Sequence, residues 1–508
     1  MAKTKPRARP ASLERGETPR TAAPPANGRE LLDMDQAIAI LKTTRPTFYR
    51  WLRSGRVKGM KVGRQWRFYR EDIERFVKGQ GPRIELAGDI GPLIRELRDR
   101  LGQIGAKAPP TSGQEEVVEA VDLMVRLAVA MQASGIHLEP GEGAVHLRLR
   151  IDGVLHSGVT YDPRLHPAIV ERWKALAACD IHEKVRPQDG RALVEFQGAG
   201  EPVDLRVCFL PAYLGESLTI RLLRREEMSF SLGRIDYLPR DRQRLLKWLG
   251  APWGMVLVTG PTGSGKTTVL YSCLAHLVGP ARKLMSIEDP VEYVIPGIVQ
   301  VPLREKEGVT FTAAVRAFLR SDPDVIMIGE IRGLEPLDLA CRAALTGHLV
   351  LTTLHTDDAV GALRRMLDVG ASAFVVADAT RLIVAQRLVR KLCPACSTAD
   401  TPSDDQLRQA ESLARAGGAD WPGLAREWRR PVGCEKCRFT GHRGRTVIAE
   451  MLEVTPDIGA ALRCGAPAVE IRALAVGQGM TTMAAHGILR AAAGETSLDE
   501  VLSVAPRA

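Results

Sequence analysis

The segment that most constrains the fold is "MVLVTGPTGSGKTTVLYS" at residues 255–272. Its first five residues predict a buried strand, and residues 268–277 predict a helix. The residues between them match G-x-x-x-x-G-K-[ST], a loop whose glycines let backbone N–H groups surround phosphates. A chance glycine-rich turn is the alternative, and the flanking strand and helix argue against it. The predicted nucleotide-binding residues are Gly260, Pro261, Thr262, Gly263, Ser264, Gly265, Lys266, Thr267 and Thr268.

Polar residues at predicted strand ends add to this site. We expect Lys266 to reach the β- and γ-phosphates of ATP, and the Thr267 hydroxyl to bind Mg²⁺. Three apolar strands carry acidic or histidine residues at their ends, in "SIEDPVEY" (286–293), "DPDVIMIGEIR" (322–332) and "TGHLVLTTLHT" (346–356). Carboxylates there can hold Mg²⁺ through water or polarise an attacking water. A histidine at such a place could sense the γ-phosphate, although a lone one is more often structural.

The order of these segments, followed by "VAQRLVRKLCPAC", resembles the secretion ATPases of type II secretion and type IV pilus assembly. The resemblance covers roughly residues 115–505. It implies an α/β fold with a RecA-like P-loop ATPase core, a preceding small α/β (PAS-like) domain, a tetracysteine zinc module and a helical tail. It also implies that Glu292 activates water, that Glu330 is the Walker B acidic residue, and that His348 and His355 form a histidine box.

Two arginines ahead of the core are implicated by the same resemblance. "PQDGRALVEF" and "VDLRVCFLP" are similar to the family's second N-terminal domain, which packs on the ATPase of the next subunit. Arg191 and Arg206 fall on the arginines that reach the nucleotide phosphates in that family. Such arginines would place positive charge against the γ-phosphate, whereas the alternative for each is a solvated surface arginine. Three positions depart from the family pattern, where Asp, Asp and Thr are usual: Gly135, Gly333 and Pro336.

Four of the nine cysteines form two C-x-x-C pairs. In a protein of the cytoplasm this spacing favours a metal over disulfides. Four thiolates suffice for a closed tetrahedral zinc site, and a tetracysteine zinc domain occurs at this place in the family. We predict a structural Zn²⁺, with a redox role as the alternative, held by Cys393, Cys396, Cys434 and Cys437.

A basic segment lies near the N-terminus. Residues 42–70 hold ten Lys and Arg and no Asp or Glu, which equals the formal net charge of +10 for the whole chain. "LLDMDQAIAILKTTRPTFYRWLRSGRV" predicts two helices, "KGMKVGRQWRF" a hairpin turning at Gly63, and "REDIERFVKG" a third helix. This resembles the winged helix-turn-helix of excisionases and MerR-type regulators. Binding to protein or to an acidic surface, and a mere tether, are the alternatives. The implied contacts with double-stranded DNA are Arg45, Thr47, Tyr49, Arg50, Arg64 and Arg67.

The chain divides into seven predicted segments. They are a disordered tail (1–29), the winged helix-turn-helix (30–80), a linker (81–113), the second N-terminal domain (114–230), the ATPase (231–390), the zinc module (391–445) and a helical domain (446–508). No run of 18 apolar residues predicts a membrane span, and no secretory signal is recognisable. We therefore expect a cytoplasmic protein, peripherally associated with the inner membrane.

The resemblance implies a homohexameric motor that hydrolyses ATP and polymerises pilin-like subunits through an inner-membrane platform protein. The basic segment supports an alternative, in which the same ATPase core serves a DNA-binding regulator or a DNA-uptake or transfer motor.

Overall fold

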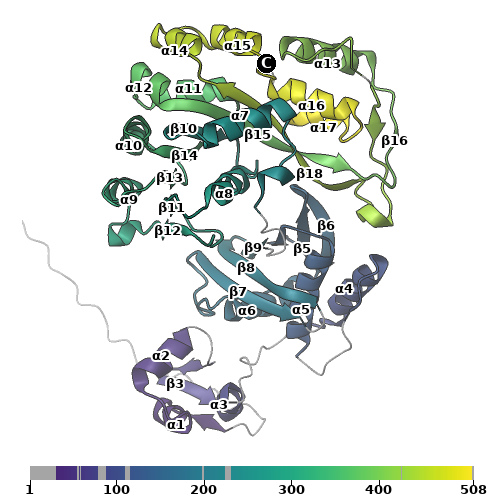
Figure 1. Cartoon of the computed structure of the whole chain (residues 1–508). Helices are drawn as coiled ribbons and strands as arrows, with labels where there is room; N and C mark the ends of the chain where they lie inside the picture. The colour runs from purple at the N-terminus through teal and green to yellow at the C-terminus, as the bar shows by residue number, and fades with distance from the viewer. Residues whose placement is uncertain are drawn as a thin grey trace, which may run out of the picture.

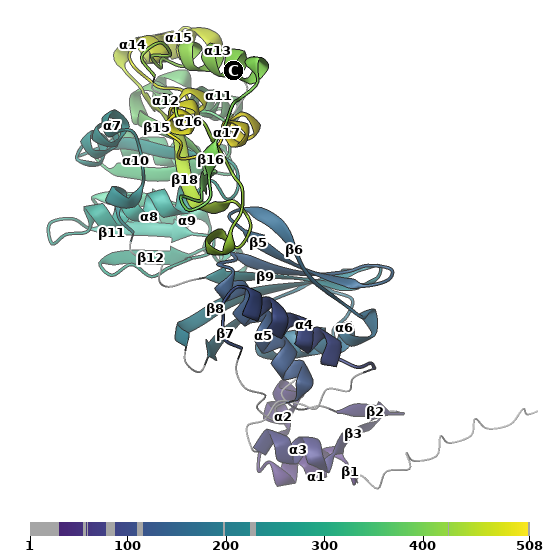
Figure 2. The same cartoon turned by 90° about the vertical axis from the view of Figure 1, so that its right-hand side faces the viewer.

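The computed structural model describes residues 30–53, 57, 59–63, 65–77, 87–108, 115–196, 199–223, 230–424 and 426–505. Three folded units follow one another from the N-terminal head, through a middle domain, to the large C-terminal domain (Figures 1 and 2). The predicted tail at 1–29 lies outside the described residues.

A seven-stranded sheet forms the centre of the large domain. Its order is β12-β11-β13-β14-β10-β15-β18, parallel except for the antiparallel pair β15 and β18. The strand expected before the phosphate loop is β10, which lies between β14 and β15 and is buried along its whole length. The strands are β10 (Gly254–Thr259), β11 (Leu284–Glu288), β12 (Ile298–Pro302), β13 (Val325–Ile328), β14 (Leu349–Leu354), β15 (Thr380–Leu392) and β18 (His442–Glu453).

Helices cover both faces of this sheet. Met255 and Leu257 point into the core shared with α9 to α12, α14 and α15, whereas Val256 and Val258 point into the core under α7 and α8. This alternation explains why β10 reads as a continuous apolar run, since a strand buried on both faces has no polar side. The helices are α7 (Pro239–Leu249), α8 (Lys266–Leu277), α9 (Phe311–Phe318), α10 (Leu334–Leu345), α11 (Ala359–Asp368), α12 (Ala373–Ala379), α14 (Pro456–Arg463) and α15 (Ala468–Gly477).

The cysteine pairs lie in an insertion between β15 and β18. This insertion contains β16 (Thr398–Ala399), α13 (Asp404–Ala416) and β17 (Arg429–Arg430). Two C-terminal helices, α16 (Met483–Ala492) and α17 (Leu498–Val504), pack against α13 through Ala410 and Ala414. The segment at 446–453, expected in the helical tail, instead forms most of β18, because its apolar run completes the central sheet.

The middle domain is an antiparallel sheet backed by helices. The strand order is β6-β5-β4-β9-β8-β7, and α5 and α6 bury their apolar faces against it. Its elements are α5 (Glu116–Ala130), β4 (Gly135–Pro140), β5 (Val145–Ile151), β6 (Val154–Tyr161), α6 (His166–Leu176), β7 (Gln188–Phe196), β8 (Ala199–Ala212) and β9 (Gly215–Leu223).

Part of the predicted linker forms a helix, α4 (Gly91–Gln103). Leu93, Leu97 and Leu101 recur at helical spacing and are buried in the same core as α5. This part of the predicted linker therefore packs as an outer layer of the middle domain (Figure 2).

The head has the expected winged helix-turn-helix order. It contains β1 (Leu31–Leu32), α1 (Met34–Ile40), α2 (Arg45–Arg53), β2 (Met60–Val62), β3 (Gln65–Tyr69) and α3 (Arg70–Val77), with strand order β1-β3-β2. Asp33 caps α1 in a reciprocal capping box with Gln36. Gly63, with φ of 64°, makes the turn of the hairpin, and Phe48 packs edge-on against Phe68 in the core.

Short 3-10 turns occur at Pro163–Leu165, Leu232–Arg234, Glu305–Glu307 and Glu435–Cys437. Within the described part of the chain, no helix combines the length and the apolar character needed to cross a bilayer.

Candidate active site

The phosphate loop joins β10 to α8, as predicted. Gly260, Gly263 and Gly265 all have positive φ, and Gly265 precedes α8 in the left-handed conformation. A Cβ at Gly260 would lie 2.4 Å from the carbonyl oxygen of Gln386, so only glycine fits there. The loop thus leads into the N-terminus of a 12-residue helix, where free N–H groups and the helix dipole favour an anion.

Lys266 is folded back onto its own loop. Its Nζ donates to the carbonyl oxygens of Gly260 at 2.8 Å and Pro261 at 3.0 Å, and lies 3.5 Å from His355 Nδ1. Burial lowers the pKa of the Lys266 ammonium, and the nearby Glu330 carboxylate opposes that shift. The ammonium is therefore held at the mouth of the loop, where phosphates would replace carbonyl oxygens as its acceptors.

A cavity of about 450 Å³ brings most of the predicted chemical groups together. Glu292, Glu330 and His355 line it opposite Lys266, and Thr267 and Thr268 line its loop side. His355 Nε2 lies 3.3 Å from Glu330 Oε2. The carboxyl ends of β11, β13 and β14 meet at this edge, which explains why residues distant in sequence converge here.

Arg332 is a site residue that sequence reasoning missed. Its Nε donates to Glu330 Oε1 at 2.6 Å, and its Nη2 donates to Asp289 Oδ2 at 2.9 Å. It therefore fixes Glu330 relative to the loop after β11. The sequence did contain a signal for Arg332, because it lies two residues after Glu330 in an extended segment. Side chains at i and i+2 of such a segment point to the same side.

His348 does not join this cavity. It precedes β14, whereas His355 follows that strand, so the two histidines lie at opposite ends of it. His348 Nδ1 is 3.0 Å from the carbonyl oxygen of Ala343 at the end of α10.

The middle domain presents Arg206 to the active site. Arg206 Nη2 lies 3.0 Å from Glu292 Oε2 within the same chain. Arg191 is its neighbour across the β7–β8 ladder but pairs with Asp204, with 2.8 Å between Nε and Oδ1. The guanidinium of Arg206 thus contacts a predicted catalytic group, while that of Arg191 remains on the sheet surface.

The three departures from the family pattern lie outside the phosphate loop. Gly135 on β4 stands in register with Arg150 on β5 and Arg221 on β9, so the sheet has no side chain between these two arginines. Gly333 is the N-cap of α10, with extended backbone and no side-chain cap. Pro336 lies in the first turn of α10, where a missing N–H costs no helical hydrogen bond.

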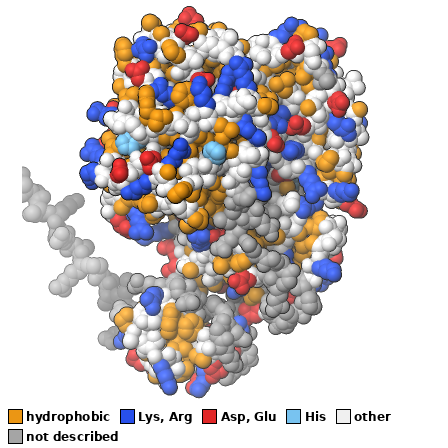
Figure 3. Space-filling view, in the orientation of Figure 1, with side chains coloured by type: hydrophobic (Ala, Val, Ile, Leu, Met, Phe, Trp, Pro, Cys, Tyr) orange, Lys and Arg blue, Asp and Glu red, His pale blue; other side chains and the backbone are white. Residues whose placement is uncertain are grey.

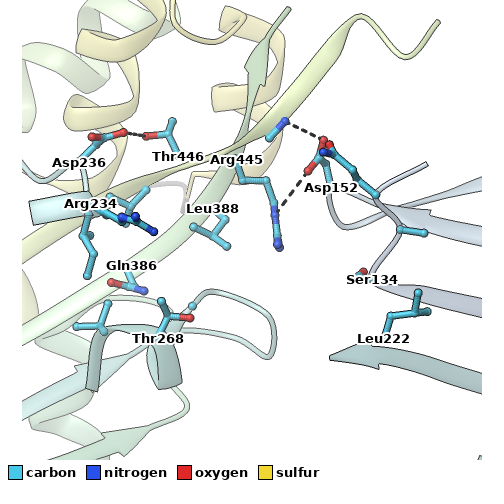
Figure 4. A pocket seen from close by; sticks show the side chains of 17 residues that line it. Ser134, Asp152, Leu222, Arg234, Asp236, Thr268, Gln386, Leu388, Arg445 and Thr446 are labelled. Carbon is cyan, nitrogen blue, oxygen red and sulfur yellow. Dashed lines mark hydrogen bonds and ion pairs between the residues drawn. The ribbon is translucent and has the colours of Figure 1, made fainter. Parts of the chain in front are cut away.

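A second cavity, of about 440 Å³, opens beside the phosphate loop between the middle domain and the ATPase (Figure 4). Thr268 and Gly265 line both cavities. Leu388 and Thr446 supply its wall from β15 and β18. This mixed apolar and polar lining, continuous with the phosphate loop, could accept the base and sugar of a nucleotide.

An interdomain contact borders this second cavity. Asp152, in the β5–β6 turn, accepts the N–H of Gly444 at 3.1 Å and faces Arg445 Nε at 3.9 Å. Figure 4 shows Asp152 reaching from the middle domain toward Arg445 across the opening. The middle domain therefore forms one wall of the second cavity.

The four predicted metal ligands form one cluster. The sulfur atoms all lie within 4.8 Å of one another, with 4.0 Å between Cys393 and Cys434 and 3.8 Å between Cys396 and Cys437. Tetrahedral zinc with bonds of about 2.3 Å requires sulfurs about 3.8 Å apart, so the cluster has the right size. Burial opposes ionisation of Cys437, but N–H donors from Cys434 and Gly441 lower its pKa to about 7.

The head carries its predicted DNA contacts on α2 and β3. Arg45, Tyr49 and Arg50 are exposed, while Thr47 is half-buried and accepts from the Thr44 hydroxyl at 3.0 Å. Arg67 donates to Gln65 Oε1 at 2.7 Å. Arg64 lies outside the described residues. The head forms a separate lobe with basic and acidic side chains on its visible face (Figure 3).

Known proteins share both parts of this architecture. The chain matches the family described as type II/IV secretion system protein over residues 111–503, and a helix-turn-helix domain over residues 31–81. It is 39% identical over 435 residues to the type IV pilus assembly ATPase PilB of Myxococcus xanthus, which covers 85% of this chain and 75% of that protein. The type II secretion system protein HxcR of Pseudomonas aeruginosa is 40% identical over 388 residues, covering 76% of this chain and 77% of that protein.

The fold has a solved counterpart. The ATPase DotB of Legionella pneumophila superposes with a TM-score of 0.54 at 20% identity, over 78% of this chain and 98% of that chain. The sequence match, the phosphate loop and the convergent carboxylates agree with one another. The chain therefore belongs to the type II/IV secretion ATPase family, and it carries a helix-turn-helix domain ahead of the ATPase.

Proposed function

We propose that this ATPase is the hexameric motor of a type II secretion or type IV pilus assembly system. It would drive polymerisation of pilin or pseudopilin subunits through an inner-membrane platform protein, at the cytoplasmic side of that membrane. The observation that carries this proposal is the cavity in which Lys266, Glu292, Glu330 and His355 meet. The 39–40% identity to a pilus assembly ATPase and a type II secretion protein supports secretion or pilus assembly as the process that ATP hydrolysis drives.

The cavity supports a division of roles in ATP hydrolysis. Backbone N–H groups of the phosphate loop and Lys266 hold the β- and γ-phosphates. The Thr267 hydroxyl and Glu330 would hold Mg²⁺, which neutralises developing phosphate charge when bound. Glu292 accepts a proton from the attacking water, and Arg206 exchanges its contact with Glu292 for one with the γ-phosphate.

A ring of six subunits would explain why two predicted site residues, Arg191 and His348, lie outside the cavity of their own subunit. Arg191 is largely exposed on the middle domain, and His348 lies at the far end of β14. In a closed ring, heterologous contacts between neighbours can bring such groups to an adjoining site. Light scattering of the ATP-bound protein tests this, because a monomeric mass in the active state would contradict it.

The cysteine cluster supports a structural zinc. Its size fits a tetrahedral ion, and four thiolates leave no position open for substrate, so we assign the ion to the stability of the insertion.

The head supports binding of double-stranded DNA as an added property. The helix-turn-helix match and the exposed basic residues on α2 favour this over a tether. The alternative function is a DNA-binding regulator or a DNA-uptake or transfer motor built on the same core.

Steady-state ATP turnover of the full-length protein tests the main proposal and its alternative together. We expect turnover that requires Mg²⁺ and that falls at least 100-fold in Glu292→Gln. Duplex DNA that leaves this rate unchanged supports the secretion motor, whereas a several-fold stimulation abolished by Arg45→Ala with Arg50→Ala supports the DNA motor. Turnover equal in wild type and Glu292→Gln would contradict both.

A further inference from the structure

The loop that carries Glu292 is anchored by a buried polar group on the phosphate helix. Tyr271 lies on α8, five residues after Lys266, and is fully buried. Its hydroxyl donates to Glu288 Oε2 and accepts the backbone N–H of Glu292 at 3.1 Å. The N–H of Tyr293 also points to this oxygen at 3.5 Å. One hydroxyl therefore joins the phosphate helix, the end of β11 and the loop with Glu292.

Glu288 is a buried carboxylate whose other oxygen is also occupied. Ser286 Oγ donates to Glu288 Oε1 at 2.5 Å, and Gln300 Nε2 donates to the same oxygen at 3.0 Å. With Tyr271 on Oε2, three donors surround one carboxylate, an arrangement that compensates a buried negative charge. Glu288 lines the cavity, and both of its oxygens already accept hydrogen bonds, so it serves as the fixed point of the network.

Gln300 holds the far side of the same loop. It lies on β12, donates to the carbonyl oxygen of Tyr293 at 2.9 Å and accepts the N–H of Ile295 at 2.7 Å. The loop from 289 to 295 is thus tied at Glu292, Tyr293 and Ile295 to groups that converge on Glu288. Burial raises the pKa of Tyr271, which keeps the hydroxyl protonated and able to donate.

From these contacts we infer that Tyr271 is a positioning residue for hydrolysis, which fixes the height of the Glu292 carboxylate over the phosphate loop. This rests on the proposed role of Glu292 as the base. Tyr271 itself does not touch the reacting atoms. Because it belongs to the helix that begins at Lys266, the base and the phosphate site move as one body. A displacement of about 1 Å in such a group can cost about 100-fold in rate.

Tyr271→Phe removes the hydroxyl and keeps the ring, whose centroid lies 5.1 Å from the ring centroid of Phe230. In the full-length protein we expect kcat for ATP to fall about 10- to 100-fold, with KM and ADP affinity within twofold of wild type. The matched control is Tyr161→Phe, which deletes a buried hydroxyl that contacts His166 Nδ1 at 2.8 Å in the middle domain. The control should retain wild-type kcat. A Tyr271→Phe protein with unchanged kcat would overturn the inference.

A double-mutant cycle separates positioning from general damage. Once Glu292→Gln has removed the base, adding Tyr271→Phe should lower single-turnover ATP cleavage no further. An additive loss would show that Tyr271 acts elsewhere and would overturn the inference. If Glu292→Gln alone turns over like wild type, the proposed base is wrong and the positioning role fails with it. Should Tyr271→Phe not fold, Gln300→Met loosens the same loop from its other side and is expected to give the same kcat loss and the same lack of additivity.

Discussion

Arg206 Nη2 lies 3.0 Å from Glu292 Oε2, so a guanidinium of the middle domain neutralises the carboxylate proposed to activate water. The contact therefore couples the position of the middle domain to the environment of Glu292 in the ATPase. Rotation of that domain away from the ATPase would separate the two charges.

Arg206→Ala should impair hydrolysis despite freeing Glu292. We expect a loss on the order of 100-fold in kcat, because the proposed exchange of contacts would bring this positive charge to the γ-phosphate. Steady-state turnover at saturating ATP measures this. Arg164→Ala, which removes an exposed arginine paired with Asp162 in the same domain, is the control. Equal or faster turnover in Arg206→Ala would contradict a role for Arg206 in hydrolysis and would mean that its contact with Glu292 only inhibits the ATPase.

Removal of zinc should destabilise the insertion. We expect about one Zn²⁺ per chain, and Cys434→Ser should lose it and lower the Tm, because metal binding and folding of such a module are coupled. Elemental analysis and thermal unfolding measure the two effects. Cys464→Ser, at an exposed cysteine on the C-terminal side, should change neither. Full zinc content in Cys434→Ser would contradict the assigned ligand set.

Stability should fall on acidification through buried His486. Burial, together with the neighbouring charge of Arg490, lowers the pKa of His486 to about 4 from an ordinary value near 6.5. Its Nδ1 lies 3.1 Å from both the backbone nitrogen and the carbonyl oxygen of Ala449. Between pH 6.5 and 4 the unfolded chain binds the proton and the folded chain does not, so the stability present above pH 6.5 is lost progressively.

The protonation of His486 should lower the free energy of unfolding by about 2 kcal/mol at pH 5. This is the distance from pH 6.5 to pH 5, about 1.5 pH units, at about 1.4 kcal/mol per unit. Tm measured from pH 7 to pH 5 should therefore fall more steeply for wild type than for His486→Gln, which cannot titrate. Parallel Tm curves for the two proteins would contradict a neutral histidine in the fold.

The basic face of α2 should carry the DNA affinity of the head. Arg45→Ala with Arg50→Ala should weaken duplex binding at least tenfold and reduce the slope of log affinity against log salt by about 2. Fluorescence anisotropy at several salt concentrations measures both. Arg70→Ala removes one charge that is already paired with Glu30 and Glu74, and it should have a smaller effect. Identical affinities in all three proteins would favour a tether.

Most of the candidate active site could be predicted from local sequence motifs. The phosphate loop, the strand at Val325–Ile328 and the histidines at the two ends of β14 follow from runs of apolar residues punctuated by polar ones, and the structure has them at those places. The convergence of Glu292, Glu330 and Lys266 follows from the rule that parallel strands present their carboxyl ends to one edge.

Contacts between distant segments could not be read from the sequence. Arg332 and Tyr271 look like an ordinary surface arginine and a core aromatic until the loop after β11 is placed beside them. The helix α4 reads as an isolated pattern because its partner α5 begins only after a Pro-rich stretch. Most of β18 reads as part of the helical tail, because its strand partner lies more than 50 residues earlier.

The pairing of β15 with β18 also has a consequence for synthesis of the chain. Until residues 442–453 emerge, one edge of the 13-residue strand β15 is unpaired, because its other neighbour among the described strands is β10. An unpaired edge of this kind templates aggregation. We therefore expect chains terminated within the cysteine insertion to aggregate even though the whole phosphate loop is present, because the sheet lacks its last strand.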